Sequence, residues 1–221
     1  MQYVTSFAMG HLMNRLAFDL DGCFFNFTSA YADLLIKVSG KDLLPEGWRT
    51  DPNFPAEWYW ERSAGYSPEV EKEVWDKYIL KGSKFWKDLE PMPYATEVAA
   101  FLNDLWKQGK ELYFISHRMG NKAKKQTEES LYYLGIDYPC VLLEGNKAPL
   151  LRLLKPNFYI DDKPSTVKDI SVTAQREQWQ DFNLFLKTAP YNKNEDCWAT
   201  GYPQSIVPSV KVGLQLAGIW A

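Results

Sequence analysis

The stretch that decides the fold is Arg15-Leu-Ala-Phe-Asp-Leu-Asp-Gly22. It is a short apolar run that ends in two acidic residues, Asp19 and Asp21, and then a glycine. Such a run, bounded by a turn signal, predicts a buried β-strand followed by a tight turn. The acidic turn after the strand is the first place to look for chemistry.

Helical and strand patterns alternate through the second half of the chain. Apolar residues at helical spacing predict a helix over 96–108, which Gly109 ends, and a buried strand follows at 111–116. Strands that alternate with helices predict an α/β protein with a mostly parallel sheet covered on both faces. The further predicted strands are 140–143, 157–161 and 182–186, and the further predicted helices are 122–133 and 147–154.

Residues 24–88 interrupt this alternation directly after the first strand. Residues 28–39 have apolar residues at helical spacing and are closed by Gly40, whereas 41–66 are irregular. Ser67-Pro68 is a strong helix start, with an N-cap candidate followed by proline in the first turn. We therefore predict a small, mainly helical cap inserted into the core.

The predicted organisation has four parts. A chain of 221 residues is long enough for one buried core and a sizeable insertion. The parts are an N-terminal extension (1–13), an α/β core (14–23 and 89–195), the helical cap (24–88) and a C-terminal tail packed on the core (196–221).

Composition excludes several classes of protein. With 46% hydrophobic and 24% charged residues, the chain is neither disordered nor collagen-like. No stretch of 18 apolar residues is present, so we expect no membrane span. The 25 Lys and Arg against 28 Asp and Glu give a net charge of −3, which argues against stable nucleic-acid binding.

Cysteine and histidine usage narrows the chemistry further. Cys23, Cys140 and Cys197 are an odd number without a CxxC spacing, which disfavours a disulfide framework or a zinc site. His11 and His117 are too few for a His-rich metal site. Because no signal peptide is visible, we expect a cytoplasmic protein.

Four polar segments end or follow predicted strands. The carboxyl ends of parallel strands meet at one edge of the sheet, where such folds bind ligands. Each segment alone has an ordinary explanation as a turn, a cap or a solvated side chain, but the order and strand context of all four favour a functional site. They are the turn from Asp19 to Gly22, Ser116, Lys147, and the pair Asp161 and Asp162.

This set resembles the motifs of the haloacid dehalogenase-like (HAD) phosphatase superfamily. The resemblance implies a Rossmann-like, doubly wound, mostly parallel sheet, with the insertion after the first strand as that superfamily's helical cap. A narrower resemblance, over about residues 15–195, is to the 5'(3')-deoxyribonucleotidases. It rests on the phrases at 83–93, 160–164 and 184–192.

The sequence departs from that family at two places. The first motif continues as Cys23-Phe-Phe-Asn26, where the family more often has small aliphatic residues and an acid. The second motif is Ser116-His117-Arg118 in place of a Thr-Ser pair. Both places neighbour the substrate, so the departures bear on nucleoside preference more than on catalysis.

The resemblance implies a catalytic role for four residues. Asp19 is the expected nucleophile, which forms an aspartyl-phosphate. Asp21 is the expected acid and base: it protonates the leaving oxygen and later activates water. The Ser116 hydroxyl and the Lys147 ammonium are expected to hold the phosphate oxygens.

The same motifs imply a magnesium site and a substrate-binding wall. Hard oxygen ligands suit Mg²⁺, and the metal candidates are Asp19, the backbone carbonyl of Asp21, Asp161 and Asp162. The substrate-binding candidates are Gly22, which lets the backbone approach the phosphate, Phe24, which could stack on a base, His117 and Arg118.

We therefore expect a Mg²⁺-dependent phosphomonoester hydrolase acting on (deoxy)nucleoside monophosphates. One alternative is a HAD phosphatase for another small metabolite or a nucleic-acid 3' phosphate. A second alternative is a non-catalytic binding module on the same fold. The expected partner is a small-molecule nucleotide, and a homodimer is a further hypothesis.

Overall fold

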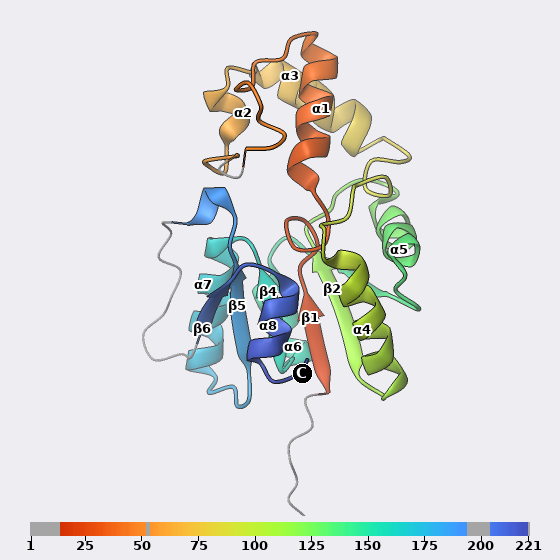
Figure 1. Cartoon of the computed structure of the whole chain (residues 1–221), viewed down its shortest axis with the longest axis vertical. Coiled ribbons are helices and arrows are strands. Elements are labelled where there is room, and N and C mark those ends of the chain that lie inside the picture. The colour runs from red at the N-terminus through yellow and green to blue at the C-terminus, as the bar shows by residue number, and fades with distance from the viewer. Residues whose placement is uncertain (1–13, 52–53, 194–203, 221) are drawn as a thin grey trace, which may run out of the picture.

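The computed structural model describes residues 14–51, 54–193 and 204–220. The predicted N-terminal extension, 1–13, and Cys197 lie outside the described residues. A central sheet with helices on both faces lies below a smaller helical layer (Figure 1). Among the described helices, none combines the length and apolarity that crossing a membrane requires.

The sheet has six described strands, which are β1 (Arg15–Phe18), β2 (Glu111–Ser116), β3 (Cys140–Leu143), β4 (Phe158–Asp161), β5 (Asn183–Lys187) and β6 (Gln204–Val207). Their order is β3-β2-β1-β4-β5-β6 and all five pairings are parallel. The predicted α/β class is confirmed. The strand order reverses at β1, so the carboxyl end of β1 faces the crevice where doubly wound sheets bind ligands.

Five described helices cover the sheet: α4 (Ala95–Lys107), α5 (Ala123–Leu134), α6 (Lys147–Leu154), α7 (Pro164–Arg176) and α8 (Val210–Leu216). Residues of α4, α5 and α8 share a core with Phe18 and Phe114. Residues of α6 and α7 share the opposite core with Ala17 and Tyr159. In Figure 1, α4 and α8 accordingly lie in front of the sheet and α6 and α7 behind it. Successive strand residues point to opposite faces, which is why Ala17 and Phe18 belong to different cores.

The segment between β1 and α4 forms a helical layer above the carboxyl edge of the sheet (Figure 1). It contains α1 (Phe27–Ser39), α2 (Trp60–Ser63), α3 (Pro68–Glu73) and the π-helical turn η1 (Val74–Ile79). Gly40 adopts the left-handed conformation that ends α1, and the Ser67 side chain accepts from the Val70 amide at the start of α3. Both ends were predicted from these residues. We keep the name cap for residues 24–88.

Two linkers join the cap to the core, and they are hydrogen-bonded to each other. The Asn26 amide donates to the Glu90 carbonyl and the Met92 amide donates to the Phe24 carbonyl, both at 2.8 Å. Buried residues of the cap, such as Tyr31, belong to the same hydrophobic cluster as the sheet residue Phe18. The cap therefore continues the core.

The chain after β5 contributes more to the fold than the sequence patterns indicated. β6 pairs with β5 along Leu184–Lys187, and α8 buries Val210 and Leu214 against the sheet. Neither β6 nor α8 was predicted. The Ser-Ile-Val of β6 is too short to stand out by periodicity, and its pairing with β5 is set by tertiary packing.

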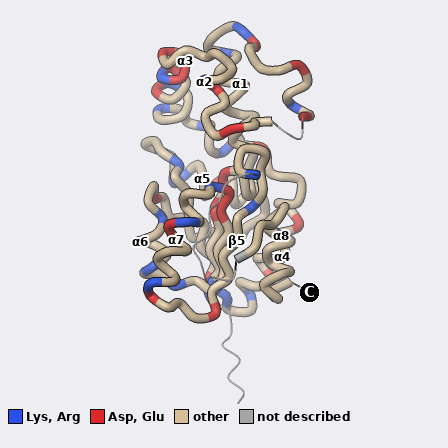
Figure 2. The backbone as a smooth tube through the Cα atoms, turned by 90° about the vertical axis from the view of Figure 1, so that its left-hand side faces the viewer, with Lys and Arg blue, Asp and Glu red and all other residues tan. Residues whose placement is uncertain are grey.

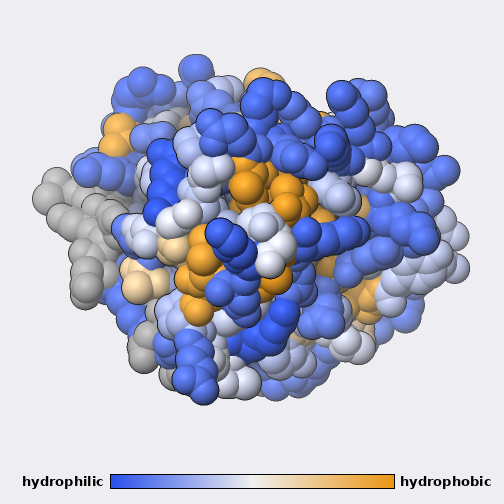
Figure 3. All heavy atoms as spheres, turned by 90° about the horizontal axis from the view of Figure 1, so that it is seen from above, coloured by the Kyte–Doolittle hydropathy of each residue, from blue (hydrophilic) through white to orange (hydrophobic). Residues whose placement is uncertain are grey.

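Charged residues of both signs are distributed over the whole fold. Lys and Arg are interspersed with Asp and Glu along the described backbone of both cap and core (Figure 2). Seen from above, the outer face of the molecule is mostly hydrophilic, with a small apolar group near its middle (Figure 3). Much of the cap's aromatic content lies instead on its inner side.

Candidate active site

The carboxyl ends of β1, β2 and β4 converge beneath the cap. Asp19 directly follows β1, Ser116 ends β2 and Asp161 ends β4. The Asp19 amide donates to the Ile160 carbonyl at 2.9 Å, which holds the acidic turn against β4. A cavity of about 590 Å³ lies between cap and core, and Asp19, Ser116 and Asp161 all line it.

Three carboxylates and one ammonium form the floor of this cavity. Asp19, Asp161 and Asp162 each offer an oxygen, and these oxygens lie within 4.8 Å of one another. Lys147, the first residue of α6, contacts Asp19 Oδ1 through its Nζ and Asp161 Oδ2 at 2.8 Å. All four side chains are buried. The structure thus brings together candidates that lie up to 143 positions apart in the sequence (162 minus 19).

The pKa values of the floor residues are shifted because several ionisable side chains are buried close together. Burial raises the pKa of Asp19 well above its usual value, although Lys147 opposes the shift. Burial also raises the pKa of Asp162 to about 7, and the negative charge of Asp161 adds to the rise. Burial acts to lower the pKa of Lys147, but Asp161 and Asp19 outweigh it and hold that pKa above its usual range. The site therefore holds more carboxyl groups than Lys147 alone can neutralise when they are ionised.

The donor set fits Mg²⁺. The three clustered side chains Asp19, Asp161 and Asp162 present only carboxylate oxygens, the hard ligands that Mg²⁺ prefers. Burial and the neighbouring carboxylates raise the pKa values of Asp19 and Asp162, and the positive charge of a divalent cation would oppose both shifts.

Glycine is required at position 22 because the backbone there lies very close to the Asp162 side chain. Its φ of +81° lies in the left-handed region. A Cβ at this position would lie 1.8 Å from Asp162 Oδ2 and 3.0 Å from the Tyr191 hydroxyl. Only glycine lets the acidic turn pack this tightly against the residue that follows β4.

Asp21 faces the cavity but is held from behind by Arg118. Two guanidinium nitrogens of Arg118 donate to the Asp21 carboxylate, Nη2 at 2.8 Å and Nε at 3.1 Å. The Ser116 hydroxyl donates to Asp21 Oδ2 at 3.2 Å. The Arg118 side chain is 0% exposed, whereas that of Asp21 is 24% exposed. Arg118 therefore contacts Asp21 and does not reach the cavity as a substrate-binding residue would.

Phe24 also differs from the sequence expectation. Its ring is fully buried and packs edge-on against Phe18 and Phe114 in the core beneath the sheet edge. It does not line the cavity, so it is not placed to stack on a bound molecule there. His117, by contrast, is exposed and lines the cavity.

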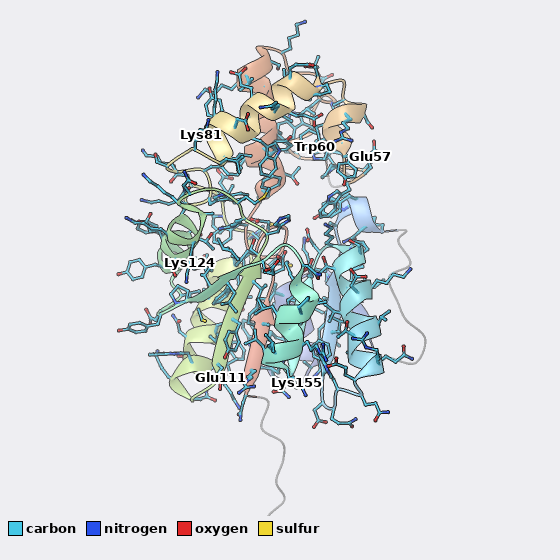
Figure 4. The ribbon with its side chains drawn as sticks, turned by 180° about the vertical axis from the view of Figure 1, so that it is seen from behind. Glu57, Trp60, Lys81, Glu111, Lys124 and Lys155 are labelled. Carbon is cyan, nitrogen blue, oxygen red and sulfur yellow. The ribbon has the colours of Figure 1, made fainter. Side chains whose placement is uncertain are left out.

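The cap supplies an aromatic wall to the cavity. Phe27 and Trp86 are stacked with ring centroids 5.9 Å apart, and Tyr31 packs edge-on against Trp60 at 6.0 Å. Trp60 lies on the inner side of the cap, facing the core (Figure 4). The aromatic residues that line the cavity are Phe27, Tyr31, Trp48, Phe54, Trp58, Tyr59, Trp60, Trp75, Trp86 and Tyr191.

Three supporting residues escaped the sequence analysis. The Tyr159 hydroxyl donates to Asp161 Oδ2 at 2.5 Å, and the Tyr191 hydroxyl donates to Asp162 Oδ2. The Asn192 side chain donates to the Asp162 carbonyl at 2.6 Å. The only available signal was the Pro-Tyr-Asn phrase after β5, and a phrase does not reveal which carboxylate its side chains reach.

The sequence matches one family model. That model is described as "5' nucleotidase, deoxy (Pyrimidine), cytosolic type C protein", and it matches residues 13–198. No curated protein matches the sequence.

Solved structures of the HAD type resemble the chain over nearly its whole length. YfnB of Bacillus subtilis, named as a HAD-hydrolase and bound to magnesium, has 11% identity and a TM-score of 0.54, covering 94% of this chain and 99% of its own. A Clostridium difficile protein described as a phosphatase has 13% identity and a TM-score of 0.52, covering 92% and 98%. The L-2-haloacid dehalogenase of Xanthobacter autotrophicus has 12% identity and a TM-score of 0.53, covering 95% and 100%. At these identities the likeness shows the fold, and the presence of a dehalogenase means that the fold alone does not select the reaction.

Proposed function

Because the chain belongs to the family of cytosolic type C deoxy (pyrimidine) 5' nucleotidases and is a phosphatase, we propose that it hydrolyses (deoxy)nucleoside monophosphates with Mg²⁺. The observation that carries this proposal is the convergence, in one cavity, of a buried Lys147 between Asp19 and Asp161 with the aromatic wall of the cap. The floor suits a phosphate and the wall suits a planar base.

The proposed reaction has two steps. Asp19 attacks the phosphorus and forms an aspartyl-phosphate, while the P–O bond to the sugar breaks and the leaving oxygen takes a proton from Asp21. Water then attacks the same phosphorus and gives its proton to Asp21, and the bond to Asp19 breaks. Inorganic phosphate and nucleoside are the products, and both carboxyl groups return to their starting state.

Lys147 and the acidic cluster prepare the attack. Lys147 orients the Asp19 carboxylate and presents positive charge to the phosphate oxygens. Asp19, Asp161, Asp162 and the Asp21 backbone carbonyl would hold Mg²⁺, whose positive charge offsets the repulsion between two anions. Gly22 leaves the floor open beside Asp162.

The aromatic wall favours a nucleotide, rather than a smaller phosphate ester, as the substrate. Stacking of a base on an aromatic side chain is worth about 1–3 kcal/mol. Three rings of this wall form one contiguous group. The centroid of the Phe27 ring lies 6.3 Å from that of Trp75 and 5.9 Å from that of Trp86. Such a group offers a face for a base while the phosphate rests on the floor.

Two other parts of the proposal concern context. The family description names a cytosolic type, which supports a cytoplasmic location. The proposed division of the chain is a core of 14–23 and 89–195, a cap of 24–88 and a tail of 196–221, and limited proteolysis would locate its boundaries. The homodimer stays a hypothesis that the molecular mass in solution would test.

A panel of phosphate monoesters tests the function. We expect deoxynucleoside monophosphates to be hydrolysed with a kcat/KM at least about tenfold above that of sugar phosphates, as the stacking energy predicts. EDTA should stop phosphate release and Mg²⁺ should restore it. If sugar phosphates are hydrolysed as well as nucleotides, the nucleotide part of the proposal fails while the phosphatase part stands.

A further inference from the structure

Arg118 is a buried cation whose charged partner faces the cavity. Its guanidinium makes the bidentate contact to Asp21 described above, and its side chain has no exposed surface. A bidentate arginine–carboxylate pair fixes both the position and the plane of the carboxylate, which a single hydrogen bond does not. The orientation of Asp21 is thus set from the side away from the cavity.

The remaining donor of Arg118 anchors it to α5. Nη1 donates to Thr127 Oγ1 at 3.2 Å and Ser130 Oγ at 3.4 Å, both on the buried face of α5, and to the Trp86 carbonyl at 3.5 Å. The guanidinium carbon also lies 4.9 Å from the centroid of the Phe25 ring and 5.2 Å from that of Trp86. Polar atoms and aromatic faces therefore hold Arg118 in one place.

This arrangement leaves Asp21 little freedom. Oδ1 accepts from Nε and Nη2, and Oδ2 accepts from Nε and Ser116. Nε carries a single hydrogen, so its two contacts are one shared bond, and three donors occupy a carboxylate that can accept about four hydrogen bonds. Asp21 is therefore fixed by three donors and keeps one acceptor position for a proton, and its side chain lines the cavity.

We propose that Arg118 is a positioning residue that holds the Asp21 carboxylate at the cavity wall. There Asp21 exchanges a proton with the leaving oxygen and with water. Arg118 itself does not touch the substrate, because its side chain is fully buried. This inference rests on the proposed roles of Asp19 and Asp21 in phosphate transfer. It does not depend on which phosphate ester is the natural substrate.

The leaving group distinguishes positioning from a merely structural role. An alcohol such as a sugar hydroxyl needs a proton as it departs, whereas para-nitrophenolate departs readily as an anion. A misplaced Asp21 should therefore slow the first step for an alkyl phosphate and barely affect it for para-nitrophenyl phosphate. Loss of folding would slow both by the same factor.

The experiment compares wild type with Arg118→Lys in the first turnover. Lysine keeps the charge but cannot make the bidentate contact. With Mg²⁺ present, we expect release of nucleoside from a deoxynucleoside monophosphate to fall by about 10²-fold, within the range that general acid catalysis contributes. Release of para-nitrophenol should change by less than about threefold. Equal losses for the two substrates, or no loss for either, would overturn the proposal.

Thr127→Val and a double variant distinguish the expected effect from misfolding and show whether it acts through Asp21, and a third variant is the control. Thr127→Val removes one acceptor of Arg118 and should shift the ratio of the two rates in the same direction by a smaller factor. In an Asp21→Asn background, Arg118→Lys should add no further change in that ratio, because the group it positions is already gone. Exposed Arg152, changed to lysine, is the matched control and should leave the ratio unaltered.

The substrates separate failure of this inference from failure of the proposed function. If the wild type hydrolyses ribose phosphate but no nucleotide, the nucleotidase proposal fails. The comparison then continues with ribose phosphate as the alkyl ester. A selective loss with that ester still supports Arg118 as a positioning residue, and an unselective loss still refutes it.

Discussion

The surroundings of the Asp19 carboxylate are formed by residues that are distant in the sequence. Lys147 reaches it from α6, and Asp161 and Asp162 approach it from the end of β4. Each neighbour alone is an ordinary polar residue at a strand or helix end. Their convergence gives Asp19 a buried position and a charged partner, which its proposed role as a nucleophile toward an anionic phosphate requires.

Asp19→Asn tests this position directly. The amide is a far weaker nucleophile, so we expect phosphate release to fall by at least about 10⁴-fold. Because burial raises the pKa of Asp19, and Lys147 keeps Asp161 as its partner, removing the charge of Asp19 should not lower the thermal midpoint. Asp137→Asn, a change at an exposed acid, is the control and should keep full activity. Substantial turnover by Asp19→Asn, after removal of host phosphatases, would exclude Asp19 as the nucleophile.

Gly22 and Gly109 form a matched pair for a second test. Both have a left-handed φ, +81° and +85°, but a Cβ meets Asp162 at the first and open space at the second. Gly109→Ala should therefore cost only about 1–2 kcal/mol of unfolding free energy. Gly22→Ala should cost more and should also weaken Mg²⁺ binding, measured by calorimetry. Similar effects of the two variants on metal affinity would contradict the close packing.

The residue scale also shows what a sequence can and cannot predict. Asp19, Asp21, Ser116, Lys147, Asp161 and Asp162 all line the cavity, because parallel strands bring their carboxyl ends together. Phe24 and Arg118 do not line it, although each lies within five residues of a catalytic candidate. The turn after β1 rotates Phe24 into the core, and only coordinates reveal that rotation.

At the scale of elements, the short η2 turn (Pro190–Asn192) supports the side of the site that carries Asp162. The Asn192 side chain accepts from the Ala189 amide at 2.8 Å and donates to the carbonyls of Asp162 and Lys187. This one buried amide therefore ties the end of β5 to the end of β4. The sequence phrase indicated a turn here but not the element it would hold.

Asn192→Ala should consequently destabilise the protein. It leaves buried donors and acceptors without partners, each worth about 1–3 kcal/mol. We expect the unfolding free energy in urea to fall by at least about 2 kcal/mol. Asn121→Ala, at an exposed position, should change it by less than about 0.5 kcal/mol. A variant as stable as wild type would show that water replaces the Asn192 side chain.

The cap wall permits a prediction about substrate. Trp75 in η1 lines the cavity, whereas Trp106 in α4 is 40% exposed and lies outside it. Trp75→Ala should raise KM for a deoxynucleoside monophosphate by about tenfold and leave KM for para-nitrophenyl phosphate within about twofold. Trp106→Ala should change neither. An equal rise for both substrates would remove Trp75 from base recognition.

For the molecule as a whole, pH and Mg²⁺ should act on stability together. The folded protein raises the pKa of Asp162 to about 7 from an ordinary value of 3.8, so the folded state binds a proton that the unfolded state has already lost. Without metal, stability should therefore fall as pH rises between about 4 and 7, by up to about 1.4 kcal/mol per pH unit. The proposed Mg²⁺ site requires deprotonated carboxylates, so the stabilising effect of Mg²⁺ should grow with pH.

Thermal midpoints at pH 5.5 and pH 8, in EDTA and in Mg²⁺, measure this linkage. The gain from Mg²⁺ should be larger at pH 8. Asp162→Asn should flatten the pH dependence in EDTA, because the group that titrates is absent. A gain from Mg²⁺ that is independent of pH would mean that Asp162 is already ionised in the metal-free protein.

The paired linkers between cap and core have a consequence for protein engineering. Because the linker that leaves the core at Phe24 is hydrogen-bonded to the linker that returns at Met92, the two linkers form one paired connection and cannot be cut independently. A chimaera that borrows a cap from a relative would have to exchange both linkers as a set. Transplanting the helices alone would leave mismatched backbone partners at the joint and bare aromatic rings beneath it.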